Sequence, residues 1–170
     1  SAVNRDKYVA ATLAKSDIAF HQFKDQVIFE KDEVLSLSNK PYSVFSPYRN
    51  ASLKKLNDFY LKPYPVDAYI QHLAKLPVSE LISLEAMGFK RTNLSEMRLP
   101  TGMSGGATLF EDFENRIHQY KDARNFPAVK GVSYLSVHLR FGTVSIRHLA
   151  RTAKNMANAG ADSWLNELIW

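Results

Sequence analysis

The last seven residues, WLNELIW, place a carboxyl group between two tryptophans. Trp164, Glu167 and Trp170 follow one another at spacings of three, so in a helix all three can lie along one face. A helix buried on a core explains the leucines and the isoleucine of this stretch, but it does not explain the acid. The stretch therefore raises a chemical question, namely what a hydrogen-bonding carboxyl does between two aromatic rings.

A second stretch that could do chemistry is GVSYLS, residues 131–136. Gly131 allows a tight backbone, and we expect Ser133 to cap a helix that begins at Tyr134. Backbone N–H groups at such a helix start, together with two serine hydroxyls, form a small anion site. An ordinary helix cap explains the same residues.

The charge distribution around this stretch favours the anion site. The net charge is +5 and the isoelectric point is near 9.4, yet no Asp or Glu stands between Asp122 and Asp162. This acid-free window holds six cations and two histidines: Arg124, Lys130, Arg140, Arg147, Arg151, Lys154, His138 and His148. A solvated basic face explains the window, and so does a surface for phosphates.

Other chemistries lack support. GMSGG, residues 102–106, satisfies the G-x-S-x-G pattern of a hydrolase nucleophile. That motif needs a strand before it, and Pro100 stands there instead, so we expect a flexible loop ahead of a helix at Leu109. The histidines show no spacing typical of ligands, so we expect no metal site. The absence of cysteine excludes disulfides and thiol catalysis.

The N-terminal part has the signals of a small α/β layer. NRDKYVAATLAKS pairs apolar residues at spacings of four and predicts a helix. Phe and Val-Ile enrichment over residues 18–29 favours short strands, and Pro47 marks the start of another helix. Four prolines then predict a connector without long regular elements over residues 61–100: Pro63, Pro65, Pro77 and Pro100.

From Ala107 onward the pattern is helical. Four apolar residues form one stripe: Leu109, Phe113, Ile117 and Tyr120. A shorter helix follows, which Gly142 could close. Ser145 is expected to cap the next helix, which ends at Gly160. Asp162 or Ser163 is expected to cap the last helix. The fold class we predict is mainly α, with the edge of an α/β domain at the N-terminus.

These elements, taken in order, resemble the DNA photolyase and cryptochrome family. The family pattern is a tyrosine, an R-x-x-P-x-x-x-G-x-S-x-L-S run and an L-x-x-G-x-x-S-x-R run. Here these are Tyr120 and residues 124–136 and 139–147. YSVFSPYRNASLKKL resembles the segment where the antenna domain gives way to the connector. WLNELIW is similar to class I cyclobutane pyrimidine dimer photolyases. The resemblance covers nearly the whole chain and is strongest over residues 120–170.

The resemblance implies three units within an internal fragment of a longer protein. Residues 1–45 would be the tail of the α/β antenna domain, and residues 46–100 the interdomain connector. Residues 101–170 would form the N-terminal part of the helical FAD-binding domain.

The resemblance also assigns roles to residues. Tyr120 and Trp164 would contact the flavin, Tyr120 at its phosphate-ribose portion. The segment that wraps the flavin diphosphate would be Val132, Ser133, Tyr134, Leu135 and Ser136. Glu167 would hydrogen-bond the pyrimidine dimer, and Trp170 would be the aromatic wall beside it. The chain departs from the family at Val132, where a threonine is common, and at Ser52, where a tryptophan is usual.

The implied activity is deoxyribodipyrimidine photolyase, a lyase in which excited reduced FAD gives an electron to the dimer. The implied partner is UV-damaged DNA, and we expect a cytoplasmic monomer. Whether the full-length protein also carries a folate-type antenna chromophore is left open by the sequence. No apolar run reaches the roughly 20 residues that span a bilayer, so we expect no membrane association. Two alternatives remain: a cryptochrome-like photoreceptor without repair activity, and a cofactor-free helical interaction module. We expect the 170-residue fragment alone to be inactive.

Overall fold

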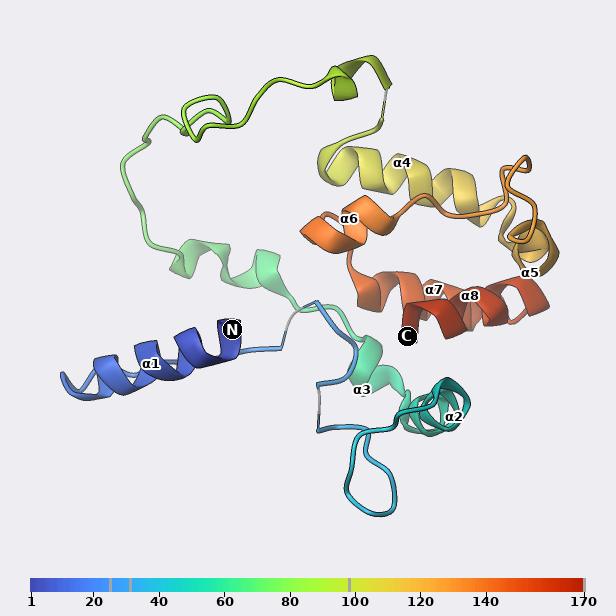
Figure 1. Cartoon of the computed structure of the whole chain (residues 1–170), viewed down its shortest axis with the longest axis horizontal. Coiled ribbons are helices and arrows are strands. Elements are labelled where there is room, and N and C mark those ends of the chain that lie inside the picture. The colour runs from blue at the N-terminus through green and yellow to red at the C-terminus, as the bar shows by residue number, and fades with distance from the viewer. Residues whose placement is uncertain (25, 31, 98, 170) are drawn as a thin grey trace.

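The structure, a computed structural model, describes residues 1–24, 26–30, 32–97 and 99–169. Within these ranges it is built from helices and loops (Figure 1). The α-helices are α1 (Ala2–Ala14), α2 (Phe45–Lys55), α3 (Asp58–Leu61), α4 (Gly102–Glu114), α5 (Tyr120–Ala123), α6 (Ser136–Phe141), α7 (Ile146–Met156) and α8 (Ala159–Ile169). The 3₁₀ helices are η1 (Val66–His72), η2 (Asn93–Met97) and η3 (Ile117–Gln119). The prediction of a mainly α fold is confirmed.

The strands predicted over residues 18–29 are wrong. The described part of this segment is an irregular chain, because a strand needs a paired neighbour and the described ranges hold no other strand. Part of the segment nevertheless contributes to the core, since Ile28 and Phe29 are buried. Phe23, by contrast, is 86% exposed. The β-propensity of these residues therefore reflects burial at a few points and not sheet formation.

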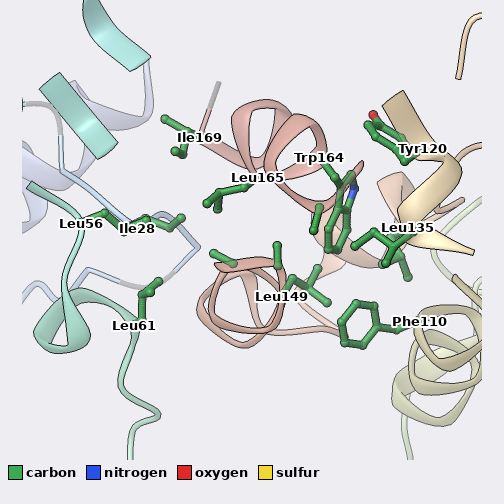
Figure 2. Close-up of a cluster of buried hydrophobic side chains, with 14 of the residues drawn as sticks. Ile28, Leu56, Leu61, Phe110, Tyr120, Leu135, Leu149, Trp164, Leu165 and Ile169 are labelled. Carbon is green, nitrogen blue, oxygen red and sulfur yellow. The ribbon is translucent and has the colours of Figure 1, made fainter. Parts of the chain in front are cut away.

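The core is centred on α7 and α8, which pack along each other. Figure 2 shows Leu149 of α7 and Leu165 of α8 in the middle of the cluster, with two groups of side chains around them. On one side lie Ile28, Leu56 and Leu61, and on the other Phe110, Tyr120, Leu135 and Trp164. The C-terminal helices thus form one packed unit, and α2, α3 and residues 26–29 dock onto it.

Between α3 and α4 the described residues, 62–97 and 99–101, follow a long arc (Figure 1). The described residues of this arc contain the two short 3₁₀ helices η1 and η2 and no longer helix, as the prolines predict. The domain limits at residues 45 and 100 stay predictions.

Several helix ends agree with the sequence patterns. Gly142 closes α6 in the left-handed conformation, with φ of 66°. The Ser145 hydroxyl accepts a hydrogen bond from the His148 backbone N–H at the start of α7. Ser52 is fully buried on α2, so the side chain at this position is internal.

Other helix ends differ from the prediction. The loop expected over residues 102–106 is the first part of α4. Gly106 allows close packing here, because a Cβ at this position would lie 2.6 Å from Cγ1 of Val144. Helix α7 ends at Met156 rather than at Gly160. The cap expected at Asp162 or Ser163 is instead Asn158, whose side-chain oxygen accepts from the Gly160 and Ala161 N–H groups.

Among the described residues, no helix combines the length and the apolar character that crossing a membrane would require.

Candidate functional site

The segment predicted to bind an anion is a shaped turn between α5 and α6. Gly131 lies against the end of α5, where an added Cβ would be 2.4 Å from the Ala123 carbonyl oxygen. Tyr134 has a φ of 58°, which is uncommon for a residue other than glycine. Leu135 is buried in the core and anchors the turn. The chain therefore changes direction sharply here, as a backbone site for an anion requires.

The helix after this turn begins two residues later than expected. Helix α6 starts at Ser136, and its start has no side-chain cap, so the prediction that Ser133 caps a helix beginning at Tyr134 is wrong. The left-handed conformation of Tyr134 explains the shift, because it interrupts the helical backbone. Ser133 is partly exposed and Ser136 is exposed, so both hydroxyls are accessible to a ligand.

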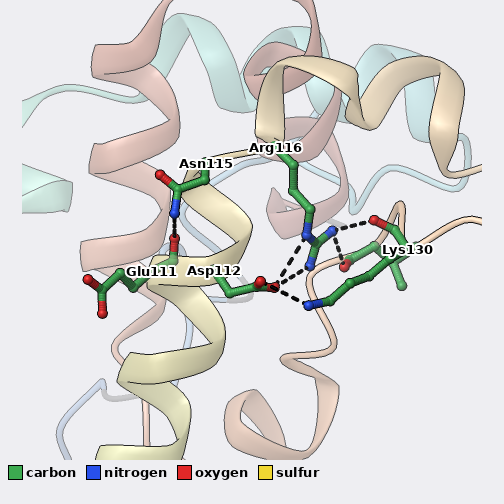
Figure 3. A network of polar contacts seen from close by, with 6 residues as sticks. Glu111, Asp112, Asn115, Arg116 and Lys130 are labelled. Atoms are coloured by element: carbon green, nitrogen blue, oxygen red, sulfur yellow. Dashed lines mark hydrogen bonds and ion pairs between the residues drawn. The ribbon is translucent and has the colours of Figure 1, made fainter.

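The turn is held in place by Arg116, which follows α4 and whose side chain reaches both Asp112 and Lys130 (Figure 3). Nη1 of Arg116 donates to the carbonyl oxygens of Lys130 and Val132, each at 2.9 Å. Nη2 and Nε of Arg116 donate to Oδ2 of Asp112, at 3.0 and 3.3 Å. Nζ of Lys130 pairs with the other oxygen of the same carboxylate at 2.9 Å. These hydrogen bonds from Lys130 and Arg116 hold the pKa of Asp112 below its usual range.

Tyr120, the first residue of α5, lies in the core. Its side chain is only 7% exposed, and its ring meets Phe113 edge to face with the ring centroids 5.7 Å apart. Burial raises the pKa of the Tyr120 phenol. The flavin contact that the resemblance implies for Tyr120 stays a prediction.

Trp164 is also a core residue. It is 3% exposed, and its ring centroid lies 4.8 Å from that of Phe113 and 5.9 Å from that of Phe110. Helix α8 thus presents Trp164 to α4 and not to an open pocket of the described residues. Its predicted contact with the flavin is untested.

Glu167, one turn further along α8, is in a different environment. Its side chain is 43% exposed, and Oε1 accepts a 2.6 Å hydrogen bond from Nη1 of Arg124. The hydrogen bond to Glu167 raises the pKa of the Arg124 guanidinium. Glu167 also borders a hollow between α8 and residues 26–29. Trp170, the other tryptophan of the predicted site, lies outside the described residues.

Arg124 connects two residues that the resemblance places in different sites. Its guanidinium carbon lies 5.2 Å from the centroid of the Tyr120 ring while its Nη1 holds Glu167. Stacking of arginine on an aromatic face restricts the side chain. The residue predicted to contact the flavin and the one predicted to contact the lesion are therefore joined through a single cation.

The acid-free window is only partly a free basic surface. Four of its six cations have partners within the chain. Arg124 pairs with Glu167 and Lys130 with Asp112. Arg147 lies over the Tyr64 ring at 4.2 Å, and Arg151 donates to the Leu61 carbonyl at 3.0 Å. Arg140 and Lys154 are exposed. The absence of nearby acids in sequence therefore does not imply unpaired cations in the fold.

The sequence patterns singled out neither Arg116 nor Asp112. Their spacing of four on a helical pattern was an available signal for an ion pair. The contacts of Arg116 with residues 130 and 132 had no such signal. Within the described ranges, no group of three or more His, Asp or Glu could hold a metal ion.

Comparison with known proteins gives one family. The family model described as DNA photolyase matches residues 1–68. Over 98% of this chain, the sequence is 32% identical to a deoxyribodipyrimidine photo-lyase of Synechococcus and 29% identical to one of Escherichia coli. The chain spans 37% and 36% of the length of these two relatives.

The fold is also found in a solved structure. The crystal structure of a bacterial class III photolyase from Agrobacterium tumefaciens superposes with a TM-score of 0.76. The superposition covers 98% of this chain and 36% of the other, at 20% identity. At that identity the likeness concerns the arrangement of the helices.

Proposed function

We propose that this chain, which belongs to the DNA photolyase family, is part of a light-driven DNA repair enzyme that splits cyclobutane pyrimidine dimers. The observation that carries the proposal is the Arg124–Glu167 ion pair stacked on Tyr120. It places a fixed, half-exposed carboxylate next to a residue of the candidate cofactor site. Because the chain spans little more than a third of these relatives, the activity is proposed for the whole protein.

Residues 132–136 would hold the diphosphate of FAD. Backbone N–H groups in a sharp turn and accessible serine hydroxyls are suitable donors for phosphate oxygens. The close approach of Gly131 to α5 and the positive φ of Tyr134 support this role, because anion-binding backbone turns use such conformations. The bound reduced flavin, excited by blue light, would supply the electron that opens the dimer.

Glu167 would recognise the lesion by hydrogen bonding. Its Oε1 accepts a hydrogen bond from Arg124, and a carboxylate can accept further hydrogen bonds through its remaining lone pairs. A thymine ring offers a matching N–H donor at its pairing edge. Extrusion of the dimer from the duplex costs unstacking energy, which is lower for a damaged pair. Exposed cations such as Arg140 and Lys154 would hold the flanking phosphates.

The first prediction concerns the flavin. In the full-length protein, changing Ser133 and Ser136 together to alanine should weaken FAD binding by at least about tenfold, since hydrogen bonds to charged groups contribute about 1.5–3 kcal/mol each. Flavin absorbance per protein after gel filtration measures this. The matched control changes the remote serines Ser36 and Ser38, and should keep its flavin. Unchanged flavin in the Ser133/Ser136 variant would contradict a cofactor role for these hydroxyls, and a full-length wild-type protein without flavin would support the cofactor-free helical module.

The second prediction concerns the lesion. Glu167→Ala in the full-length protein should lower light-dependent repair of a thymine dimer by about tenfold or more while FAD remains bound, because one hydrogen bond to a charged group is lost. Repair is measured by recovery of absorbance near the thymine band under blue light. Glu111→Ala, on the exposed side of α4, is the control. A flavin-loaded wild-type protein without repair would support the photoreceptor alternative.

A further inference from the structure

We propose that Arg116 is a positioning residue that fixes residues 130–134 in the shape that binds the flavin diphosphate. The inference rests on the proposed function of this segment. It assigns a role to a residue outside the motifs that suggested that function. The contacts in Figure 3 carry it.

The Arg116 side chain uses its planar fork in two directions. One nitrogen, Nη1, binds the carbonyl oxygens of Lys130 and Val132, while Nη2 and Nε bind Asp112 on α4. The guanidinium therefore bridges a rigid helix and the turn. Only arginine has a fixed array of donors that can bind a carboxylate and two carbonyls at once. The side chain is 16% exposed, so water competes little for these donors.

Binding of these carbonyls also determines where the neighbouring N–H groups point. In a trans peptide group the C=O and the following N–H point in opposite directions. Since the Val132 carbonyl faces Arg116, the Ser133 N–H faces away from Arg116. Arg116 thus sets the direction of a donor that the proposed function assigns to phosphate.

The unusual backbone of Tyr134 gives a second reason for a support at this place. Its φ of 58° is unfavourable for a side chain with a Cβ, so surrounding contacts must hold it. The guanidinium carbon of Arg116 lies 5.9 Å from the Tyr134 ring centroid and 5.1 Å from that of Phe113. Arg116 therefore contacts the turn at two backbone carbonyls and at the aromatic ring of Tyr134.

Asp112 completes the support from the helix side. It accepts from Arg116 and from the Lys130 side chain, so one edge of the guanidinium and the Lys130 side chain are both tied to α4. The lowered pKa of Asp112 agrees with a carboxylate that stays ionised between two cations. Removing its charge should loosen Arg116 without removing the guanidinium.

The test compares Arg116→Lys, Arg116→Ala and Asp112→Asn with wild type in the full-length protein. Two readouts are taken: amide hydrogen exchange of residues 130–135 and the FAD dissociation constant. Arg116→Lys keeps the charge but lacks the fork. It should speed exchange in this segment and weaken FAD by at least about tenfold, and Asp112→Asn should change both readouts in the same direction. Arg91→Lys is the control, since Arg91 also pairs with a carboxylate, Glu85, but is exposed and remote.

The outcomes separate this inference from the proposed function. Unchanged exchange over residues 130–135 in folded Arg116→Lys would overturn the inference. Faster exchange with unchanged FAD affinity would overturn it as well. If Ser133 and Ser136 variants then still lose FAD, the proposed function stands and only the role of Arg116 fails. If they keep FAD too, the flavin site itself is wrong. If the Arg116→Ala variant folds, it should show the largest change in exchange and in FAD affinity. If it does not fold, Asp112→Asn still tests the inference.

Discussion

Gly160→Ala is expected to disrupt the packing of α8, lowering the free energy of unfolding by about 3 kcal/mol, the upper end for an overpacked core. A Cβ at this position would lie 2.0 Å from the carbonyl oxygen of Ile117 and 2.7 Å from that of His118. Both obstructing atoms belong to the backbone of η3, so no side-chain rotation can relieve the clash. At an exposed helical site the same change would stabilise the protein. A loss of unfolding free energy therefore supports the close packing of Gly160, and a gain would contradict it.

Urea unfolding followed by circular dichroism measures the difference in free energy. The matched control is Gly142→Ala, where φ is 66° but the nearest atom to an added Cβ is the flexible end of Gln26, 3.4 Å away. Gly142→Ala should lower the free energy of unfolding by about 1–2 kcal/mol, the strain of a residue with a Cβ in the left-handed conformation. Equal stabilities of the two variants would contradict the close approach of α8 to η3.

The features that the sequence predicted well are those that depend on near neighbours in the chain. A glycine after a short amphipathic segment closes α6, and a serine before another amphipathic segment caps α7. The apolar stripe from Leu109 to Tyr120 does face the core, with Phe113, Ile117 and Tyr120 buried. The helix is broken there into α4, η3 and α5, which the stripe alone did not indicate.

The features that were missed depend on the tertiary fold. Residues 102–106 read locally as a loop, but they form the first part of α4, in which Gly106 packs against His138 and Val144 where a Cβ would not fit. The apolar residues of the 18–29 segment read as strands, but no strand in the described ranges pairs with them. Local propensity decides a structure only where packing does not override it.

The same contrast between local sequence signals and tertiary contacts applies to the candidate site. The segment 131–136 was recognisable because its glycine and serines follow one another in the chain. The partner of Glu167 was not, since Arg124 lies 43 residues earlier, and ion pairs across such distances have no local signal. Spacing also suggested that Trp164 and Glu167 share one environment, whereas the fold buries the first and leaves the second half exposed.

Trp164→Ala is expected to lower the free energy of unfolding by about 3–5 kcal/mol, the usual cost of removing a buried aromatic ring. The ring of Trp164 fills the space between Phe110 and Phe113, and alanine would leave a cavity there. Urea unfolding measures the loss. Phe59→Ala, which removes an exposed ring on α3, should cost less than about 1 kcal/mol.

Trp164→Phe separates the structural role from the flavin contact that the resemblance implies. Phenylalanine keeps an apolar ring in the core, so the variant should fold with a loss of about 1–2 kcal/mol, but it lacks the indole N–H and the larger face. If Trp164 touches the flavin, the folded variant in the full-length protein should bind FAD about tenfold more weakly. If it serves only the core, flavin affinity should stay at the wild-type value while stability falls. The second result would leave Glu167, whose carboxylate pairs with Arg124, as the described residue of the WLNELIW segment that is still a candidate for a ligand contact.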